Sequence, residues 1–200
     1  HKSDDLPAGV NHIDYDVTDA EAKLSGLPDI IHGLVYGVGT INLKPFQALS
    51  EDDFLYDYKL NVLGAVNVLK QALKSLKASK DASVVFFSTV AVQTGINFHA
   101  SIAAAKGAIE GLTRSLAAEW ARNNVRVNAI APSLTDTPMA ANLLSNDDKK
   151  QASSQRHPLG RYGKPEEVAA VAHFLLTPQA SWLSGQIIGV DGGMGALRPL

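Results

Sequence analysis

Lys106 lies in an alanine-rich segment, residues 101–122, whose composition favours an α-helix. The residue four positions earlier, Ile102, shares its helical face and carries no proton to give. His99 precedes this helix, and an imidazole titrates near neutral pH. Thr89 follows an apolar segment and offers a hydroxyl group. These residues provide a cation, a hydroxyl and a titratable ring for chemistry where a strand ends and a helix begins.

Strand-like and helix-like segments alternate along the chain, which is typical of a parallel sheet covered by helices. The predicted strands are residues 11–17, 29–36, 83–88, 125–130 and 186–190. The predicted helices are residues 18–24, 50–77, 101–122, a short one near 142–151 within an irregular 133–160, and one starting at 165. The order predicts an α/β fold: a doubly wound, Rossmann-like parallel sheet with helices on both faces, in a single domain.

Composition restricts the classes of partner. The chain has 200 residues, 46% of them hydrophobic and 19% charged, which suits one soluble domain with a sizeable core. A net charge of −2 without a basic stripe argues against nucleic acid and anionic membranes as main partners. No apolar run approaches the ~18 residues of a membrane span, and cysteine is absent. The histidines lack ligand spacing, so we expect no metal site. The composition as a whole fits a cytoplasmic protein.

Five segments form a joint pattern along the chain. They are Leu-Asn-Val-Leu-Gly at 60–64, Phe-Ser-Thr-Val-Ala at 87–91, a proline loop at 131–139, Arg-Tyr-Gly-Lys-Pro-Glu-Glu-Val at 161–168, and a strand ending in Asp-Gly-Gly at 184–193. Their order and spacing resemble the short-chain dehydrogenase/reductase family. In that family a tyrosine donates a proton to the substrate carbonyl while nicotinamide delivers hydride. A lysine one helical turn later lowers the pKa of the tyrosine and binds the nicotinamide ribose.

The resemblance assigns catalytic roles to three residues and leaves one role vacant. Lys106 matches the lysine, Thr89 matches the hydroxyl that polarises the carbonyl, and Asn61 matches an asparagine whose backbone holds a relay water. Ser88 is the neighbouring alternative to Thr89, but its side chain should point the opposite way. Ile102 stands where the tyrosine is expected.

No shift of register repairs the loss, because no tyrosine occurs between Tyr58 and Tyr162. His99, Ser101 and Tyr36 are the candidates for a substitute donor. Asn61 is also a poor residue for the middle of a helix, so we expect a local kink with a freed carbonyl there.

The resemblance also implies a cofactor, NAD or NADP. The residues it places against the cofactor are Asp16 and Val17 on the adenine side, Gly37 and Gly39 beneath it, Lys106 at the ribose, and Pro132, Leu134 and Thr137 in the nicotinamide loop. Ser133 replaces the glycine of that loop. A second interpretation of Asp16 is that it only caps the next helix.

The phosphate-binding turn of the family has no counterpart that we accept. Residues 33–39 fit Gly-x-x-x-Gly-x-Gly, but the following residues 40–45 cannot open the helix that such a turn requires. We therefore expect residues 1–200 to form one dinucleotide-binding domain that lacks its first strand-helix-strand unit. The choice between NAD and NADP depends on that unit.

Two functions remain open. The first is an NAD(P)-dependent oxidoreductase acting on a small carbonyl or alcohol, with altered proton donation. The alternative is a catalytically inactive dinucleotide-binding sensor or scaffold. The partners expected are a small-molecule substrate and further copies of the chain, as a tetramer or dimer. Helices 50–77 and 101–122 carry more apolar positions than one sheet face can cover, and the family pairs them across a two-fold axis.

Overall fold

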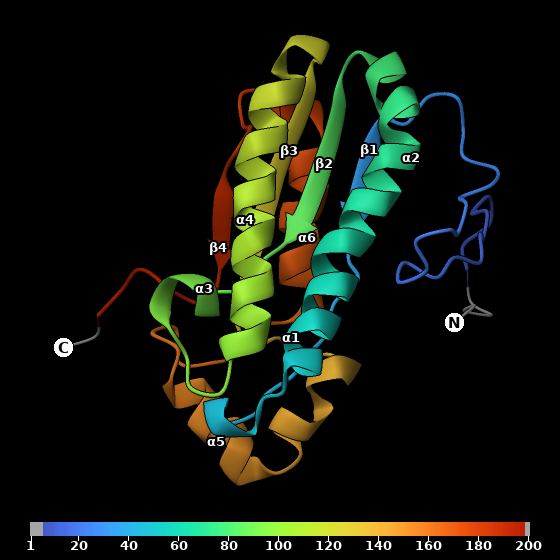
Figure 1. The fold of residues 1–200 in the computed structure, drawn as a ribbon. Helices are drawn as coiled ribbons and strands as arrows, with labels where there is room; N and C mark the ends of the chain where they lie inside the picture. The colour runs from blue at the N-terminus through green and yellow to red at the C-terminus, as the bar shows by residue number, and fades with distance from the viewer. Residues whose placement is uncertain (1–5, 199–200) are drawn as a thin grey trace.

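The computed structural model describes residues 6–198 and contains a parallel sheet of four strands (Figure 1). The strands are β1 (Gly33–Tyr36), β2 (Ala82–Phe87), β3 (Val125–Pro132) and β4 (Ile187–Val190), and they lie side by side in chain order. Gly33 of β1 pairs with Ser83 of β2, and Ala82 of β2 pairs with Val125 of β3. The predicted parallel α/β fold is confirmed.

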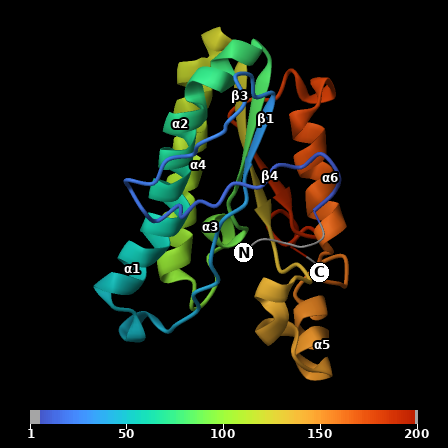
Figure 2. The ribbon, with the colours of Figure 1, turned by 90° about the vertical axis from the view of Figure 1, so that its right-hand side faces the viewer.

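Helices cover both faces of this sheet. Figure 2 shows α2 (Gly64–Ser79) and α4 (Ala100–Trp120) on one face and α6 (Pro165–Leu176) on the other. Leu76 and Ile109 are buried on the first face, and Ile130 and Leu175 on the second. Burial of each such side chain contributes about 1.5–3 kcal/mol. Because β2 and β3 are covered on both sides, they read as almost continuous apolar runs.

The helix predicted at 50–77 is continuous but changes its geometry midway. It starts with α1 (Glu51–Tyr58), where Ser50 and Asp53 cap each other's backbone N–H groups. A π-helical turn, Lys59–Leu63, then joins α1 to α2. Asn61 lies in this turn, so the helix is irregular where the sequence predicts a kink.

The π turn is fixed by Tyr36 at the end of β1. The hydroxyl of Tyr36 donates a 2.7 Å hydrogen bond to the backbone oxygen of Leu60 in this turn. Gly64 follows, and a Cβ at that position would clash with the same hydroxyl. The end of β1 is thus linked to the π turn through the phenol of Tyr36.

The shorter elements gather at the carboxyl ends of the strands (Figures 1 and 2). They include α3 (Ala91–Thr94), the 3₁₀ turns Phe46–Ala48 and Pro138–Leu144, and α5 (Asp147–Gln155). The helix predicted near 142–151 is thus displaced toward the C-terminus, because Asn146 caps it by accepting from the N–H of Lys149. The remaining 3₁₀ turns are Ala121–Asn123 and Pro178–Ala180. No helix within residues 6–198 is long and apolar enough to cross a bilayer.

The strand predicted at 11–17 and the helix predicted at 18–24 are wrong. These residues form turns and extended chain along the outer edge of the sheet, beside α2 (Figure 1). A strand needs a ladder of backbone partners, and this segment pairs with no described strand. Gln71 of α2 holds it instead, donating to Tyr15 Oη at 3.0 Å and accepting from the N–H of Leu24 at 2.7 Å. An isolated helix of seven residues is too short to be stable without packing.

Candidate active site

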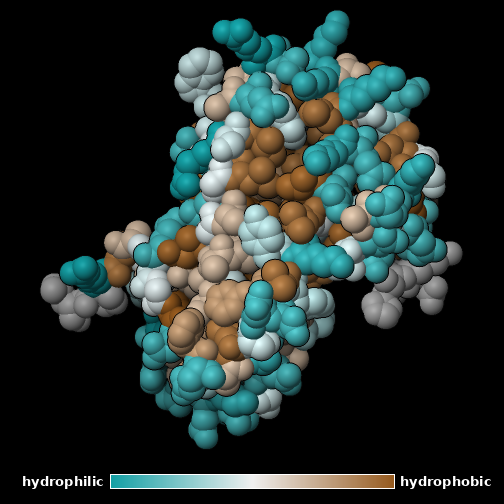
Figure 3. Space-filling view, viewed as in Figure 1, coloured by the Kyte–Doolittle hydropathy of each residue, from teal (hydrophilic) through white to brown (hydrophobic). Residues whose placement is uncertain are grey.

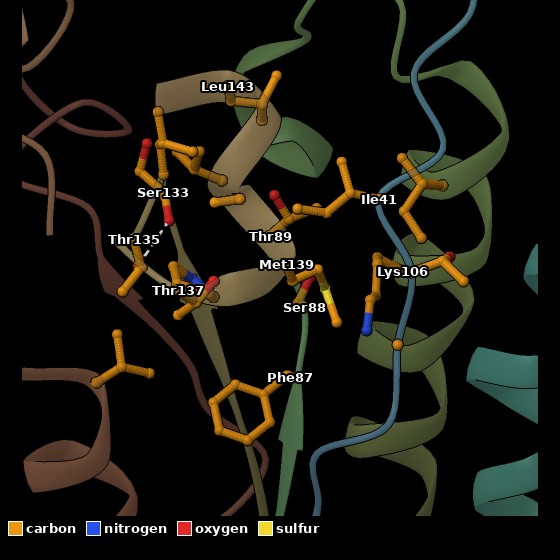
Figure 4. A pocket seen from close by; sticks show the side chains of 18 of the residues that line it. Ile41, Phe87, Ser88, Thr89, Lys106, Ser133, Thr135, Thr137, Met139 and Leu143 are labelled. Atoms are coloured by element: carbon orange, nitrogen blue, oxygen red, sulfur yellow. Dashed lines mark hydrogen bonds between the residues drawn. The ribbon is translucent and has the colours of Figure 1, made fainter. Parts of the chain in front are cut away.

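A cleft with a volume of about 740 Å³ opens at the carboxyl ends of β1, β2 and β3 (Figure 4). Ligands of open α/β sheets bind at this edge. The cleft brings together nine of the residues singled out from the sequence: Gly37, Gly39, Thr89, His99, Ile102, Lys106, Pro132, Leu134 and Thr137. No helix starts between β1 and Phe46, as predicted for residues 40–45.

Lys106 projects from α4 into the cleft (Figure 4), although its residue is only 8% exposed. Burial disfavours the charged ammonium and lowers its pKa from 10.5 to about 8. The negative charge of Asp57 on α1 acts in the opposite direction and raises the pKa. Lys106 is therefore a cation that exchanges its proton close to neutral pH.

Asn61, buried in the π turn, lies behind Lys106. Its Nδ2 donates to the backbone oxygen of Asp57 at 2.8 Å and to Thr40 Oγ1 at 3.4 Å. Its Oδ1 is buried and has no hydrogen-bond partner among the described residues. A Cβ on Gly39 would lie 3.2 Å from this Oδ1 and 3.3 Å from Lys106 Nζ. Residue 39 must stay small for both groups to reach this part of the cleft.

Thr89 and Ser88 point in different directions at the end of β2, as the alternation of side chains predicts. Ser88 Oγ is buried and donates to Glu110 of α4 at 2.8 Å. Thr89 Oγ1 accepts from the N–H of Ala91 at 3.3 Å and remains free to donate its proton. Figure 4 shows Thr89 between the Lys106 side and the Ser133 side of the cleft.

Ile102 lines the cleft one helical turn from Lys106 and is 5% exposed. Of the three candidates for a substitute donor, His99 alone lines this cleft. Its Nδ1 lies 2.7 Å from the backbone oxygen of Asn97, so Nδ1 carries the hydrogen. Tyr36 is bound to the π turn, and burial raises the pKa of its hydroxyl.

Ser133 and His157 form a pair on the opposite side that the sequence argument missed. Ser133 Oγ lies 2.8 Å from His157 Nε2, and His157 Nδ1 lies 2.7 Å from the backbone oxygen of Ser153. Because a carbonyl oxygen only accepts, Nδ1 holds the ring hydrogen and Nε2 accepts from the serine. No signal in the sequence joins two residues 24 positions apart across an irregular segment.

Within residues 6–198, no three histidine or acidic side chains are grouped as metal ligands.

Asp16 and Val17 do not line the cleft. Asp16 is exposed and accepts from the hydroxyl and the N–H of Thr18, bonds that lower the pKa of its carboxyl group. Val17 packs toward Gly64. The alternative, in which Asp16 caps the next helix, is not met, because residues 18–24 form turns and no helix. Contact of Asp16 or Val17 with adenine stays a prediction.

Comparison with known proteins agrees with this geometry. A family model described as enoyl-(acyl carrier protein) reductase matches residues 9–195. The chain belongs to the short-chain dehydrogenase/reductase family. It is 39% identical over 161 residues to a tropinone reductase homolog of Arabidopsis thaliana, which covers 80% of this chain and 62% of the relative. The chain thus spans about three fifths of the length of that curated relative.

Solved structures of the family superpose on the chain. An aldohexose dehydrogenase of Thermoplasma acidophilum is 27% identical with a TM-score of 0.86, covering 97% of this chain and 82% of that one. A gluconate 5-dehydrogenase of Burkholderia cenocepacia, in complex with NADP and tartrate, is 27% identical with a TM-score of 0.80, covering 84% and 66%. The family consists of oxidoreductases that use NAD or NADP.

Proposed function

We propose that this protein is an NAD(P)-dependent oxidoreductase that interconverts a small carbonyl compound and its alcohol, with a proton donor other than tyrosine. The observation that carries the proposal is the convergence of Lys106 and Thr89 on one cleft at the carboxyl edge of the sheet, with the buried Asn61 and the lysine ammonium both close to Gly39. These are the positions that the family uses for ribose binding, carbonyl polarisation and the proton relay.

The residues of the cleft fit a nicotinamide nucleotide. Lys106 offers a cation with three N–H donors for ribose hydroxyls, and Gly39 keeps the floor free of a side chain. The orphaned Oδ1 of Asn61 offers a buried acceptor beside them. When bound, the reduced nucleotide would supply a hydride. Pro132, Leu134 and Thr137, together with Asp16 and Val17 on the adenine side, are the further contacts we propose.

Other residues prepare the substrate. The Thr89 hydroxyl donates a hydrogen bond to the carbonyl oxygen, which makes the carbonyl carbon more electrophilic. Apolar side chains enclose the rest of the space and exclude water, and they include Ile41, Leu43, Phe87, Ile96, Met139, Leu143 and Val168. Relatives are named for the reduction of tropinone and for the oxidation of aldohexoses and gluconate. An apolar lining favours a compact ketone over a polyol.

A cofactor titration of the full-length protein tests the proposal. We expect micromolar binding of NADH or NADPH by nicotinamide fluorescence, weakened at least about tenfold in Lys106→Ala because the charged ribose contact is lost. A panel of small ketones and aldehydes, followed at 340 nm, then measures turnover. Folded protein that binds neither nucleotide would contradict the proposal.

The inactive sensor or scaffold remains a second candidate because of Ile102 alone. It keeps the nucleotide site and loses the group that the family uses to deliver a proton. Micromolar binding without turnover of any carbonyl in the panel would favour this second function.

We further propose a cytoplasmic homo-oligomer, a tetramer or a dimer. Figure 3 shows apolar side chains gathered on the face that carries α4 and α2. Leu55, Tyr56, Tyr58 and Leu63 on the helix leading into α2 are each more than two fifths exposed. Isologous contacts through such a face are a common symmetric solution. Light scattering at working concentration measures the mass, and a monomer would count against this assembly.

A further inference from the structure

Asp57 is a fully buried carboxylate on α1, with 0% of its surface exposed. A buried carboxylate is costly unless hydrogen bonds and an opposite charge compensate for lost hydration. Its Oδ1 accepts from Thr40 Oγ1 at 2.8 Å, and its Oδ2 accepts from Asn42 Nδ2 at 3.4 Å. Both donors are neutral, so the compensating charge must come from elsewhere.

Lys106 lies near the inner end of these bonds. Thr40 Oγ1 also accepts from Asn61, and a Cβ on Gly39 would lie 3.2 Å from Asn61 Oδ1 and 3.3 Å from Lys106 Nζ, so both groups approach Gly39. The charge of Asp57 raises the pKa of Lys106 against the effect of burial. On the outer side, Asn42 also donates to Asp53, which forms an ion pair with Lys44 at 2.6 Å. That second carboxylate already has its own cation.

We propose that Lys106 is the general acid of the reaction and that Asp57 is the positioning residue that keeps its ammonium group protonated. The inference rests on the proposed oxidoreductase function. It assigns to the lysine the proton transfer for which the family employs the tyrosine that Ile102 replaces.

The step balances with groups already named. In carbonyl reduction, the carbonyl carbon receives a hydride from the reduced nucleotide, and the C=O π electrons move to oxygen. That oxygen forms an O–H bond with a proton from Lys106 Nζ, and the N–H bond breaks. The products are an alcohol, the oxidised nucleotide and a neutral amine. The amine regains its proton from solvent before the next turnover.

Lys106 suits this role better than its neighbours. Ile102 has no acidic proton, and the Tyr36 hydroxyl is bound to the π turn away from the cleft. A general acid works best when its pKa lies near the operating pH, and burial brings the pKa of Lys106 to about 8. His99, which also lines the cleft, is the remaining competitor.

The first test measures Lys106 without any cofactor. The lysines of the full-length protein are labelled by reductive ¹³C-methylation, and the Lys106 signal is assigned by its loss in Lys106→Arg. We expect its NMR titration midpoint near pH 8, and in Asp57→Asn lower by about one unit, because an attractive charge is lost. Asp52→Asn, an exposed carboxylate on the same helix, is the matched control and should leave the midpoint unchanged.

A midpoint near 10.5, the usual value, would overturn the inference, as would a midpoint that Asp57→Asn does not move. If Asp57→Asn does not fold, Thr40→Val serves instead, because it removes the hydroxyl that donates to Asp57. We expect Thr40→Val to move the Lys106 midpoint, whereas Asp52→Asn leaves it unchanged. An unchanged midpoint in Thr40→Val then overturns the inference.

The second test separates the lysine as acid from the lysine as cation. Lys106→Arg keeps the charge but holds its proton too tightly to donate it. We expect this variant to bind the nucleotide within about threefold of wild type and to lose at least about 10²-fold in kcat. In Asp57→Asn, the decline of kcat at high pH should start at lower pH, with nucleotide binding unchanged at pH 6.

The outcomes distinguish failure of the proposed oxidoreductase function from failure of the assignment of Lys106 as general acid. Wild-type protein that binds no nucleotide or reduces no carbonyl overturns the proposed function and this inference with it. Wild-type turnover that survives in Lys106→Arg overturns only the inference and leaves the oxidoreductase standing. If His99→Ala abolishes turnover and Lys106→Arg retains it, the proton comes from His99.

Discussion

The two sides of the cleft are built from different kinds of structure. We call Thr40 and Lys106, which line the cleft, and the buried Asp57 and Asn61, which do not line it, the lysine wall, and Ser133, Met139, Leu143 and His157 the loop wall. Apart from Thr40, the lysine wall stands on α1, the π turn and α4, and its charges are buried. The loop wall follows β3 through the 3₁₀ turn Pro138–Leu144 and α5, and it combines two apolar side chains with one serine–histidine pair. Rigid helices thus fix the charges, while a loop shapes the space for substrate.

The largest expected effect comes from restoring a tyrosine to the lysine wall. In Ile102→Tyr a phenol stands one turn from Lys106, whose charge favours the phenolate form. We expect carbonyl reductase activity to rise by at most about 10²–10⁴-fold, the usual contribution of a general acid, and by less than this if Lys106 already donates the proton in wild type. Ile102→Phe, which adds the ring without the hydroxyl, is the control for steric change.

The result also bears on the other wall. An inert Ile102→Tyr protein that still binds nucleotide would mean that the loop wall no longer accepts a carbonyl substrate. The sensor or scaffold would then be the better account. If His99 already delivers the proton, wild type turns over and His99→Ala abolishes the activity.

The same contrast explains what the sequence revealed. Asn61, Lys106 and Thr89 were predictable because their segments resemble motifs of the family. The helical period then placed residues 102 and 106 on one face, and the alternation of side chains at a strand end separated Thr89 from Ser88. Asp57 was missed, although it lies four residues before Asn61 and so shares its face. An acidic residue on that inward face was the available signal.

The loop wall and the first segment were beyond the reach of local patterns. His157 meets Ser133 only because bonds such as that from the N–H of Gly163 to the oxygen of Leu134 fold residues 133–163 back on themselves. Residues 11–17 have the composition of a strand, but a strand exists only with a pairing partner. Long-range pairing of this kind leaves no period in the sequence.

Burial of the Lys106 ammonium should lower the free energy of unfolding. The pKa of Lys106 is about 8 in the folded protein and 10.5 when exposed, so the unfolded chain binds more protons between these values. The free energy of unfolding therefore rises with pH from about 8 to 10.5, and the cost is fully present below pH 8. Lys106→Met removes it, and we expect a gain of up to about 3 kcal/mol at pH 7.

Urea denaturation at pH 7 and pH 10 measures this gain, which should shrink at the higher pH. A Lys106→Met protein that is less stable than wild type at pH 7 would contradict the prediction. It would mean that attraction by Asp57 outweighs the cost of burial.

The π turn behind the lysine wall gives a smaller effect. Gly64→Ala places a Cβ against the Tyr36 hydroxyl, and overpacking of this kind costs about 1–3 kcal/mol. Gly107→Ala on α4 is the matched control, because its Cβ meets Val92 Cγ1 at an ordinary 3.8 Å. That control should stabilise by about 0.5–1 kcal/mol, as glycine to alanine does in a helix. Thermal denaturation compares the two, and a neutral Gly64→Ala would show that the π turn is not fixed by Tyr36.

The smallest expected effect tests whether the loop wall takes any part in proton transfer. Ser133→Ala removes the donor to His157 Nε2 and leaves a buried imidazole without that bond, which should cost about 1 kcal/mol of stability. Ser133→Gly, the residue found in the family, should lose somewhat more because glycine has greater freedom when unfolded. Both variants should keep nucleotide binding and the pH dependence of kcat. If Ser133→Ala shifts that pH dependence with binding intact, the Ser133 hydroxyl and His157 take part in proton transfer together with Lys106. The claim that only the lysine wall transfers the proton would then be wrong.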